Sequence, residues 1–417
     1  MNRFYYLFLV IFIVVILPVR GSSVSNKNID STEELTQNDK SLIASLINLS
    51  FLLNREQLSA KRINKLKIED KELIDYIDKF SDKIKNISQS EKVSYLIEKI
   101  KEDDNSFNDY INDFKKIILN DGGKLDGVYG KWDSFSGNGI SFILFPKDKT
   151  EKYGIFIYKK DSENEKLFAK ELEQYTEFIS VLPVKEDDFQ KSPILKNIIF
   201  AKKIFSNRKI NNMFIYPPID DKTDYMQKGV IVYENGLRFK DYERLGKKYL
   251  NEYKNSMINQ KIILRLRLYH IIFHSVGPFF IKDKESITID KPLKELFLSI
   301  EEIKAEIMSY LFIDYLIKQE DIFKKYYSNI EPNFIIYLSD RKDRRGSIAS
   351  DFILNYLLDK GGIKEEGGKK IINKSKFTPL LYLLLKKIIN IESEGDYNKA
   401  KEILIKYKKP TFWGKND

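Results

Sequence analysis

The chain has 417 residues, of which 42% are hydrophobic and none is cysteine. It therefore has enough apolar material for two or three packed domains, and disulfide bonds and a lipid attached at cysteine are both excluded. Lys and Arg outnumber Asp and Glu by 71 to 61, a formal net charge of +10. Because these charges alternate along the predicted helices and no aromatic-basic motif accompanies them, we expect a solvated surface and no nucleic-acid partner.

The first residues have the layout of an export signal. Asn2-Arg3 precedes an apolar run at 4–19, and Arg20-Gly21-Ser22-Ser23 follows it. We therefore expect residues 1–22 to be a signal peptide and the mature protein to be exported, to the periplasm or the extracellular space if the source is bacterial. The alternative is an uncleaved membrane anchor, since the run is short for a span of about 20 residues but long for a signal core.

Three amphipathic helices are predicted within the next region, residues 23–121. Their apolar stripes recur at helical spacing. The stripes are Leu42, Leu46, Leu49 and Leu53; Leu73, Ile74, Ile77, Phe80, Ile84 and Ile87; and Val93, Leu96, Ile97 and Ile100. Ser88 and Glu91 form a capping pair before the third.

Residues 122–245 read as a mixed α/β region. It opens with a loop, since six of the nineteen glycines lie within 122–139. Short aromatic and β-branched runs then predict strands, with a hairpin turn at Pro146-Lys147-Asp148 between the first two. The predicted elements are strands at 140–145, 153–158, 212–216 and 229–233, and a helix at 163–182.

Residues 246–417 are helical nearly to the end, with a short β-like interruption at 287–289 and breaks at Pro332, Gly346 and Gly361-Gly362. We therefore predict an α+β fold that is predominantly helical. It has two lobes, a mixed α/β middle lobe and a helical lobe, and a cleft between them is where a ligand is expected to bind.

The only two histidines of the chain, His270 and His274, lie four residues apart. A helix predicted over 249–276, which ends at Gly277-Pro278, places both imidazoles on one face at the spacing found in zinc-binding helices. A second predicted helix, 299–307, carries Glu302 and Glu306 one turn apart, and one of these carboxylates could complete a His, His, Glu site. The alternative is that both histidines are simply packed helix residues.

Such a site would have three protein ligands and an open fourth position, which is the arrangement of catalytic zinc. The usual zinc-peptidase helix reads His-Glu-x-x-His, and its Glu deprotonates the metal-bound water. Here Ile271 occupies that position, and an isoleucine cannot transfer a proton.

With these segments in place, the chain resembles the dipeptidyl peptidase III family of zinc exopeptidases in its shorter bacterial form. The resemblance runs from about residue 140 to 407. Four stretches carry it: 270–278, similar to His-Glu-x-x-His-Gly-x-Gly-Pro; 301–306 (Glu-Glu-Ile-Lys-Ala-Glu), similar to the second zinc motif; 215–221, similar to Asn-x-Pro-Asn with a following acidic residue; and 355–362, similar to Asn-Tyr-Leu-x-x-Lys-Gly. The resemblance implies a two-lobed protein that binds one zinc ion through His270, His274 and Glu302, with Glu306 orienting a histidine.

The departures from the family pattern all concern chemistry. Besides Ile271 at the place of the general base, Ile215 and Pro218 stand where the family has the asparagines that hold the peptide amino group. The family's further histidine near the reacting carbonyl has no counterpart in Asp343-Arg344-Arg345-Gly346-Ser347. No residue can therefore be assigned as catalytic, and whether the protein is an enzyme is left open.

Three hypotheses follow from these residues. The first is an exported protein of impaired catalysis that binds a peptide or protein ligand in the cleft. The second is an active zinc exopeptidase with Glu301 or Glu306 as a non-standard base, although Glu301 lies about 100° round its helix from Glu302. The third is a structural envelope protein without metal.

Overall fold

A computed structural model describes residues 35–66, 68, 70–103, 139–145, 153–183, 198–207, 213–216, 229–233, 236–274, 276–341 and 344–407. The chain divides into two compact units, Met1–Leu35 and Thr36–Asp417, and the account below concerns the second. The export segment, the glycine-rich loop at 122–138, the turn at 146–148 and Pro218 lie outside the described residues.

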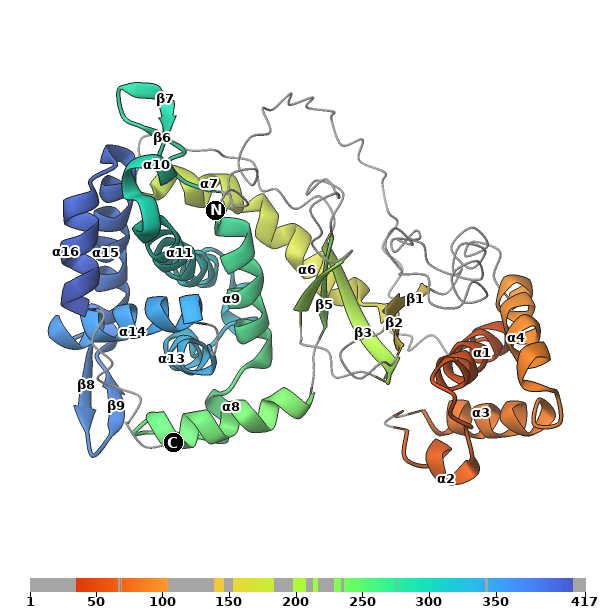
Figure 1. The fold of residues 1–417 in the computed structure, drawn as a ribbon. Helices are drawn as coiled ribbons and strands as arrows, with labels where there is room; N and C mark the ends of the chain where they lie inside the picture. The colour runs from red at the N-terminus through yellow and green to blue at the C-terminus, as the bar shows by residue number, and fades with distance from the viewer. Residues whose placement is uncertain are drawn as a thin grey trace. The chain divides into compact units, whose positions relative to one another are not determined.

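The region after residue 35 is helical, as predicted. It contains α1 (Gln37–Leu53), α2 (Ala60–Ile63), α3 (Lys71–Lys83) and α4 (Gln89–Asp103) (Figure 1). Leu42, Leu46 and Leu49 of α1 and both isoleucines of α4 are buried because their spacing places them on one face of each helix, whereas Leu53 is half-buried. The predicted cap is present, since the Glu91 backbone N–H donates to Ser88 Oγ at 3.4 Å. The three stripes therefore form the core of these helices.

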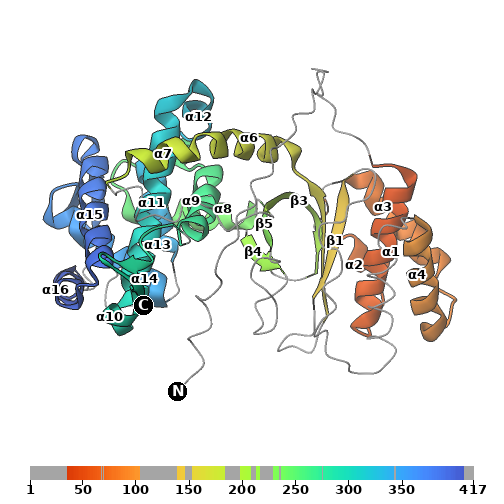
Figure 2. The same cartoon turned by 90° about the horizontal axis from the view of Figure 1, so that it is seen from above.

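A five-stranded sheet with the order β1-β2-β3-β5-β4 follows (Figure 2). Its strands are β1 (Ile140–Phe145), β2 (Gly154–Lys160), β3 (Ile198–Ser206), β4 (Met213–Tyr216) and β5 (Gly229–Tyr233). All pairings are antiparallel except that between β3 and β5. Four of the strands are predicted from the sequence, but the central β3 is not. The adjacent Lys202 and Lys203 are both exposed, and they interrupt the alternation by which a strand is recognised.

The helix predicted over 163–182 is instead two helices, α6 (Ser162–Glu173) and α7 (Tyr175–Val181). Asp161 caps α6 by accepting the backbone N–H of Asn164 at 3.2 Å. The chain then changes direction at Gln174, which ends α6 and begins α7. The apolar spacing continues through this bend, so the sequence pattern alone does not reveal it.

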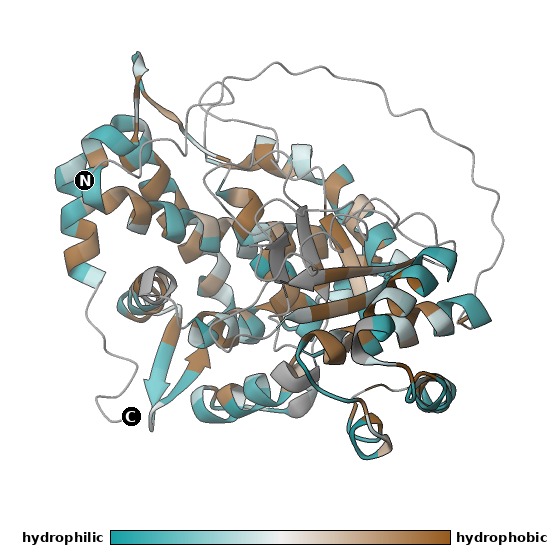
Figure 3. Ribbon diagram, turned by 45° about the vertical axis from the view of Figure 1, so that its right-hand side comes forward, coloured by the Kyte–Doolittle hydropathy of each residue, from teal (hydrophilic) through white to brown (hydrophobic). Residues whose placement is uncertain are grey.

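The remaining chain is mainly helical, with two short hairpins. Its elements are α8 (Gly236–Tyr249), η5 (Asn255–Met257), α9 (Gln260–Phe273), β6 (Phe280–Ile281), β7 (Lys284–Thr288), α10 (Asp290–Leu293), η6 (Lys294–Leu296), α11 (Phe297–Gln319), α12 (Asp321–Tyr326), α13 (Ile330–Asp340), α14 (Arg344–Asp359), β8 (Ile363–Glu366), β9 (Lys369–Ile372), α15 (Lys374–Glu394) and α16 (Tyr397–Tyr407). Figure 3 shows apolar and polar stretches alternating along many of these helices, as amphipathic packing requires.

Three predicted features of this region are wrong. The helix predicted over 249–276 is interrupted, because Asn259 starts a new helix by accepting the backbone N–H groups of Lys261 and Ile262 at 3.0 and 3.4 Å. Neither Pro332 nor Gly346 is a break, since each lies in the first turn of a helix, Pro332 in α13 and Gly346 in α14. At this place in α13 the missing N–H of proline removes no helical hydrogen bond.

The fold class is α+β and predominantly helical, as predicted. Helix α9 packs against α11, and the ring of Phe312 meets Tyr269 edge-on at a centroid distance of 4.7 Å. Tyr269 directly precedes His270, so this contact sets the register between the two helices that carry the candidate site. Among the described residues, no helix combines the length and apolar character needed to cross a membrane.

Candidate metal centre

His270 and His274 meet at the C-terminal end of α9. His274 is the C-cap residue and keeps helical dihedral angles, so the two side chains lie one turn apart on the same face. Their Nε2 atoms are 3.0 Å apart. His270 is buried and His274 is partly exposed, so the pair lies where the protein interior meets solvent.

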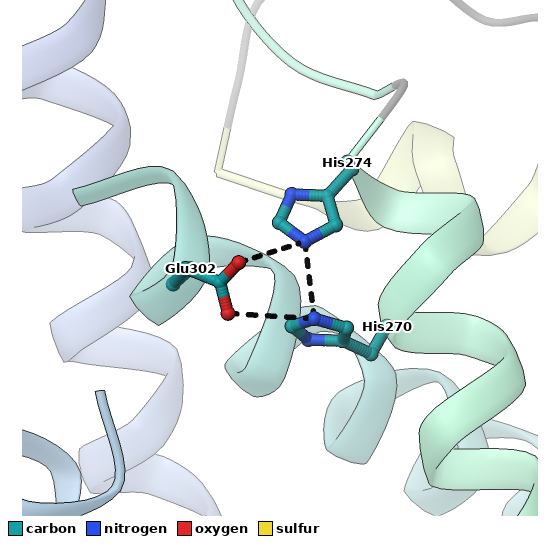
Figure 4. A group of neighbouring side chains, drawn as sticks. All are labelled: His270, His274 and Glu302. Atoms are coloured by element: carbon teal, nitrogen blue, oxygen red, sulfur yellow. Dashed lines mark hydrogen bonds and ion pairs between the residues drawn. The ribbon is translucent and has the colours of Figure 1, made fainter. Parts of the chain in front are cut away.

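Glu302 of α11 faces both imidazoles. Its Oε2 is 3.5 Å from His270 Nε2 and its Oε1 is 3.5 Å from His274 Nε2 (Figure 4). These three residues offer one ligand atom each, and the atoms all lie within 4.8 Å of one another. Two helices far apart in sequence thus bring together the three residues that the sequence singles out.

A second pair of carboxylates lies behind the histidines. Glu306 Oε1 is 3.5 Å from His270 Nδ1, and Glu301 Oε1 is 3.4 Å from His274 Nδ1. A carboxylate beside Nδ1 favours the tautomer that carries its proton there, which leaves the Nε2 lone pair free to bind a metal. The family resemblance implies this orienting role for Glu306. It does not predict the role for Glu301.

Two cations pair with these carboxylates, and neither was predicted from the sequence. Arg341 follows α13, and its Nη2 and Nη1 lie 3.0 Å from Glu302 Oε2 and 2.9 Å from Glu306 Oε1. Lys304 Nζ lies 2.7 Å from Glu301 Oε2. Both pairs join residues whose charges would be costly to bury alone.

The cluster still has a surplus of negative charge, since three carboxylates face the two histidines and only two cations oppose them. The titration of the site reflects this surplus. Burial alone would lower the pKa of His274, but Glu301 and Glu302 raise it to about 9. Burial lowers the pKa of His270 despite the nearby Glu306. The carboxylates therefore favour a positive charge at His274, whereas burial disfavours one at His270.

The donor set fits a small dication. With a proton on each Nδ1, two Nε2 lone pairs would face each other at 3.0 Å, which is repulsive unless a proton or a metal ion lies between them. Ligand atoms about 2.0 to 2.2 Å from a tetrahedral zinc lie about 3.3 to 3.6 Å from one another. The two histidine–Glu302 separations, 3.5 Å each, fall in that range, and the separation of the two nitrogens is slightly shorter. Two imidazoles and one carboxylate are ligands that zinc accepts.

The glutamate that acts as general base in the zinc-peptidase motif is replaced here by Ile271. Ile271 lies between the two histidines on α9 and is half-buried. Ile215 lies in β4, whereas Pro218 is outside the described residues. The chain has no third histidine, and Gly346 lies in the first turn of α14. The structure thus brings together the predicted ligands, with Ile271 on the helix between the two histidines.

The fold is similar to that of bacterial dipeptidyl peptidase III. The dipeptidyl peptidase III of Caldithrix abyssi matches with a TM-score of 0.66 over 90% of this chain and 91% of that one, at 15% identity. The dipeptidyl-peptidase III of Corallococcus sp. strain EGB matches with a TM-score of 0.52 over 77% of this chain and 64% of that one, at 16% identity. No protein-family model and no curated protein matches the sequence. At such identities the likeness concerns the fold alone.

Proposed function

We propose that this protein is an exported zinc-binding relative of dipeptidyl peptidase III that binds a peptide or protein ligand and cleaves peptides very poorly. One observation carries the proposal. The two Nε2 atoms and Glu302 converge with their orienting carboxylates in place, while the residue between the histidines is Ile271. Zinc bound by His270, His274 and Glu302 would polarise a peptide carbonyl as a Lewis acid.

The neighbouring glutamates are poor substitutes for the missing base. Glu306 is fully buried and faces Arg341 and His270. Burial would raise its pKa, but His270 and Arg341 lower it to about 2. Glu301 has one oxygen on Lys304 and the other facing His274. A carboxylate held in this way is a weak proton acceptor near neutral pH, which disfavours an active peptidase with a non-standard base.

The ligand and its location are proposed from the resemblance. A peptide would bind in a cleft between the mixed α/β part and the helical part, with its carbonyl near the metal. Ile215 and Pro218 would give its amino group no amide partners, so the ligand need not present a free N-terminus.

Residues 1–22 would act as the signal peptide that directs export. N-terminal sequencing of the mature protein tests whether they are removed. A mature chain that begins at Met1 would indicate an anchor instead.

Metal analysis tests the central part of the proposal. We expect about one zinc per purified wild-type chain and a large loss in His274→Ala, with Lys318→Ala, an exposed change on α11, as the matched control. A wild type without zinc after incubation with the metal would favour the metal-free structural hypothesis. An assay on dipeptidyl-arylamide substrates separates the two zinc-binding hypotheses, the catalytically impaired protein and the active peptidase. Efficient cleavage by the zinc-loaded wild type would establish the active peptidase.

A further inference from the structure

Lys304 is a lysine buried in the core of α11. Only 2% of its surface is exposed, and its Nζ lies 2.7 Å from Glu301 Oε2 and 3.6 Å from Glu392 Oε2. Glu392 belongs to α15 and is fully buried. A buried ammonium is costly unless carboxylates compensate it, so these two residues explain how Lys304 can be there. They do not yet explain what it does.

The two oxygens of Glu301 have different partners. Oε2 accepts a hydrogen bond from the Lys304 ammonium, and Oε1 faces His274 Nδ1 at 3.4 Å. An unrestrained carboxylate can rotate and present either oxygen, or neither, to the imidazole. Because Lys304 occupies one oxygen, the other is left on the side of the histidine. Lys304 therefore contacts the candidate metal ligand His274 only indirectly, through Glu301.

Gly277 closes the space around this ammonium from the other side. A Cβ at this position would lie 2.5 Å from Lys304 Nζ, and the φ angle of +143° is one that other residues rarely adopt. From the sequence, Gly277-Pro278 is interpreted only as the signal that ends the helix carrying His270 and His274. The glycine also lets the chain after α9 pass directly over the lysine.

We propose that Lys304, held by Glu392 and covered by Gly277, is a positioning residue that fixes Glu301 against Nδ1 of His274 and so orients this histidine toward the metal. The inference rests on the proposed zinc site. Partners one shell away from a metal typically change its affinity by about 10- to 100-fold when removed. We expect a loss of this size in Lys304→Met, whose side chain has nearly the same shape and no charge.

The test measures the zinc dissociation constant by chelator competition in wild type, Lys304→Met, Glu301→Gln and the double variant. If Lys304 acts through Glu301, the double variant binds zinc no more weakly than Glu301→Gln alone. Losses that multiply in the double variant would overturn the inference. The matched control is Lys318→Met, which removes an exposed lysine from the same helix and should leave the affinity unchanged.

Cobalt substitution supplies a readout that a stability defect would not change. We expect the visible absorption of the Co²⁺ protein to shift in Lys304→Met, because a misoriented His274 alters the ligand geometry, and to be unaltered in Lys318→Met. An unchanged spectrum together with unchanged zinc affinity would refute the role of Lys304. If Lys304→Met does not fold, the double variant, which removes both opposed charges, carries the same comparison against Glu301→Gln. A wild type that binds no zinc would instead refute the proposed function.

Discussion

Arg341 and Glu302 form an ion pair through the same carboxylate oxygen that faces His270. Arg341 Nη2 lies 3.0 Å from Glu302 Oε2, and this oxygen is 3.5 Å from His270 Nε2. The other end of the guanidinium lies 2.9 Å from Glu306 Oε1. Arg341 therefore compensates the negative charges of two carboxylates. One belongs to the candidate ligand Glu302, and the other to the fully buried Glu306, which lies beside His270 Nδ1.

This arrangement predicts that Arg341→Met destabilises the metal-free protein. Removing one partner of a buried ion pair leaves an uncompensated charge, here on Glu306, and costs on the order of 3 kcal/mol. Zinc would restore part of the loss because it brings positive charge to the same cluster. Denaturant unfolding with EDTA and with zinc measures both effects. Arg244→Met, on the exposed face of α8, is the control, and equal stabilities of the two variants in EDTA would contradict the prediction.

A second prediction concerns catalysis. A general base typically contributes a factor of about 10² to 10⁴, so we expect the zinc-loaded wild type to cleave dipeptidyl-arylamides very poorly. Ile271→Glu, combined with Ile215→Asn and Pro218→Asn, should raise turnover, because it returns both the base and the amine contacts. The losses of the general base and of the amine contacts affect the same reaction, so their effects on turnover need not be additive.

The control is Ile271→Gln in the same combination, which has the size of the glutamate and cannot accept the proton. Gain with Glu and none with Gln would identify the base as the missing element. If neither variant gains activity, Gly346→His is the next change to add. Wild-type turnover within about tenfold of an active relative would rule out impaired catalysis, since the smallest loss expected is larger than that.

A third prediction concerns Glu171, the buried carboxylate that joins α6 to α9. Glu171 is fully buried and accepts hydrogen bonds from Arg265 Nε, at 3.0 Å, and from the hydroxyls of Tyr269 and Tyr327. Glu171→Gln keeps the shape but leaves the Arg265 guanidinium uncompensated, so we expect a loss of about 3 to 5 kcal/mol in the free energy of unfolding. Glu173→Gln, exposed on the same helix, should change it by less than about 0.5 kcal/mol. Similar urea midpoints for both variants would show that the network contributes little.

The candidate ligands could be predicted because their signal is local. His270 and His274 are four residues apart on one helix, and Glu302 and Glu306 are four apart on another, so helical periodicity alone places each pair on one face. The resemblance then connects the two helices. Most strands of the sheet were also predictable, since runs such as 140–145 and 229–233 consist mainly of β-branched and aromatic residues.

The cations and buried partners of the site could not be predicted in this way. Arg341 and Glu392 reach the cluster through tertiary packing of α11, α13 and α15, and nothing in their local sequence distinguishes them from the many solvated charges of the chain. Lys304 lies three residues from Glu301 on α11, but ordinary exposed ion pairs have the same spacing. The start of α9 was missed for a similar reason. Asn259 is held as a cap partly by Asn333, whose Oδ1 accepts its backbone N–H at 2.9 Å from far along the chain.

The last prediction is a pH dependence at Lys370, away from the metal centre. Its side chain in β9 is 2% exposed, and Nζ lies 4.7 Å from the ring centroid of Tyr249. Burial lowers the pKa of Lys370 to about 8, and Glu365 only partly opposes the shift. Below pH 8 both folded and unfolded chains bind the proton, and the folded state carries the full cost of the buried charge. Between pH 8 and about 10.4 the unfolded chain binds more protons, so the free energy of unfolding rises with pH.

Lys370→Met should therefore stabilise the protein at pH 7, by on the order of 1 to 3 kcal/mol, and the gain should shrink as the pH rises from 8 toward 10. Urea unfolding of wild type and variant at both pH values measures the difference, in which the titration of all other groups cancels. Lys364→Met, exposed in the partner strand β8, should show no such trend because its ammonium stays hydrated in both states. A gain in Lys370→Met that is equal at pH 7 and pH 10 would mean that the methionine stabilises by packing and that the buried charge is not the cause.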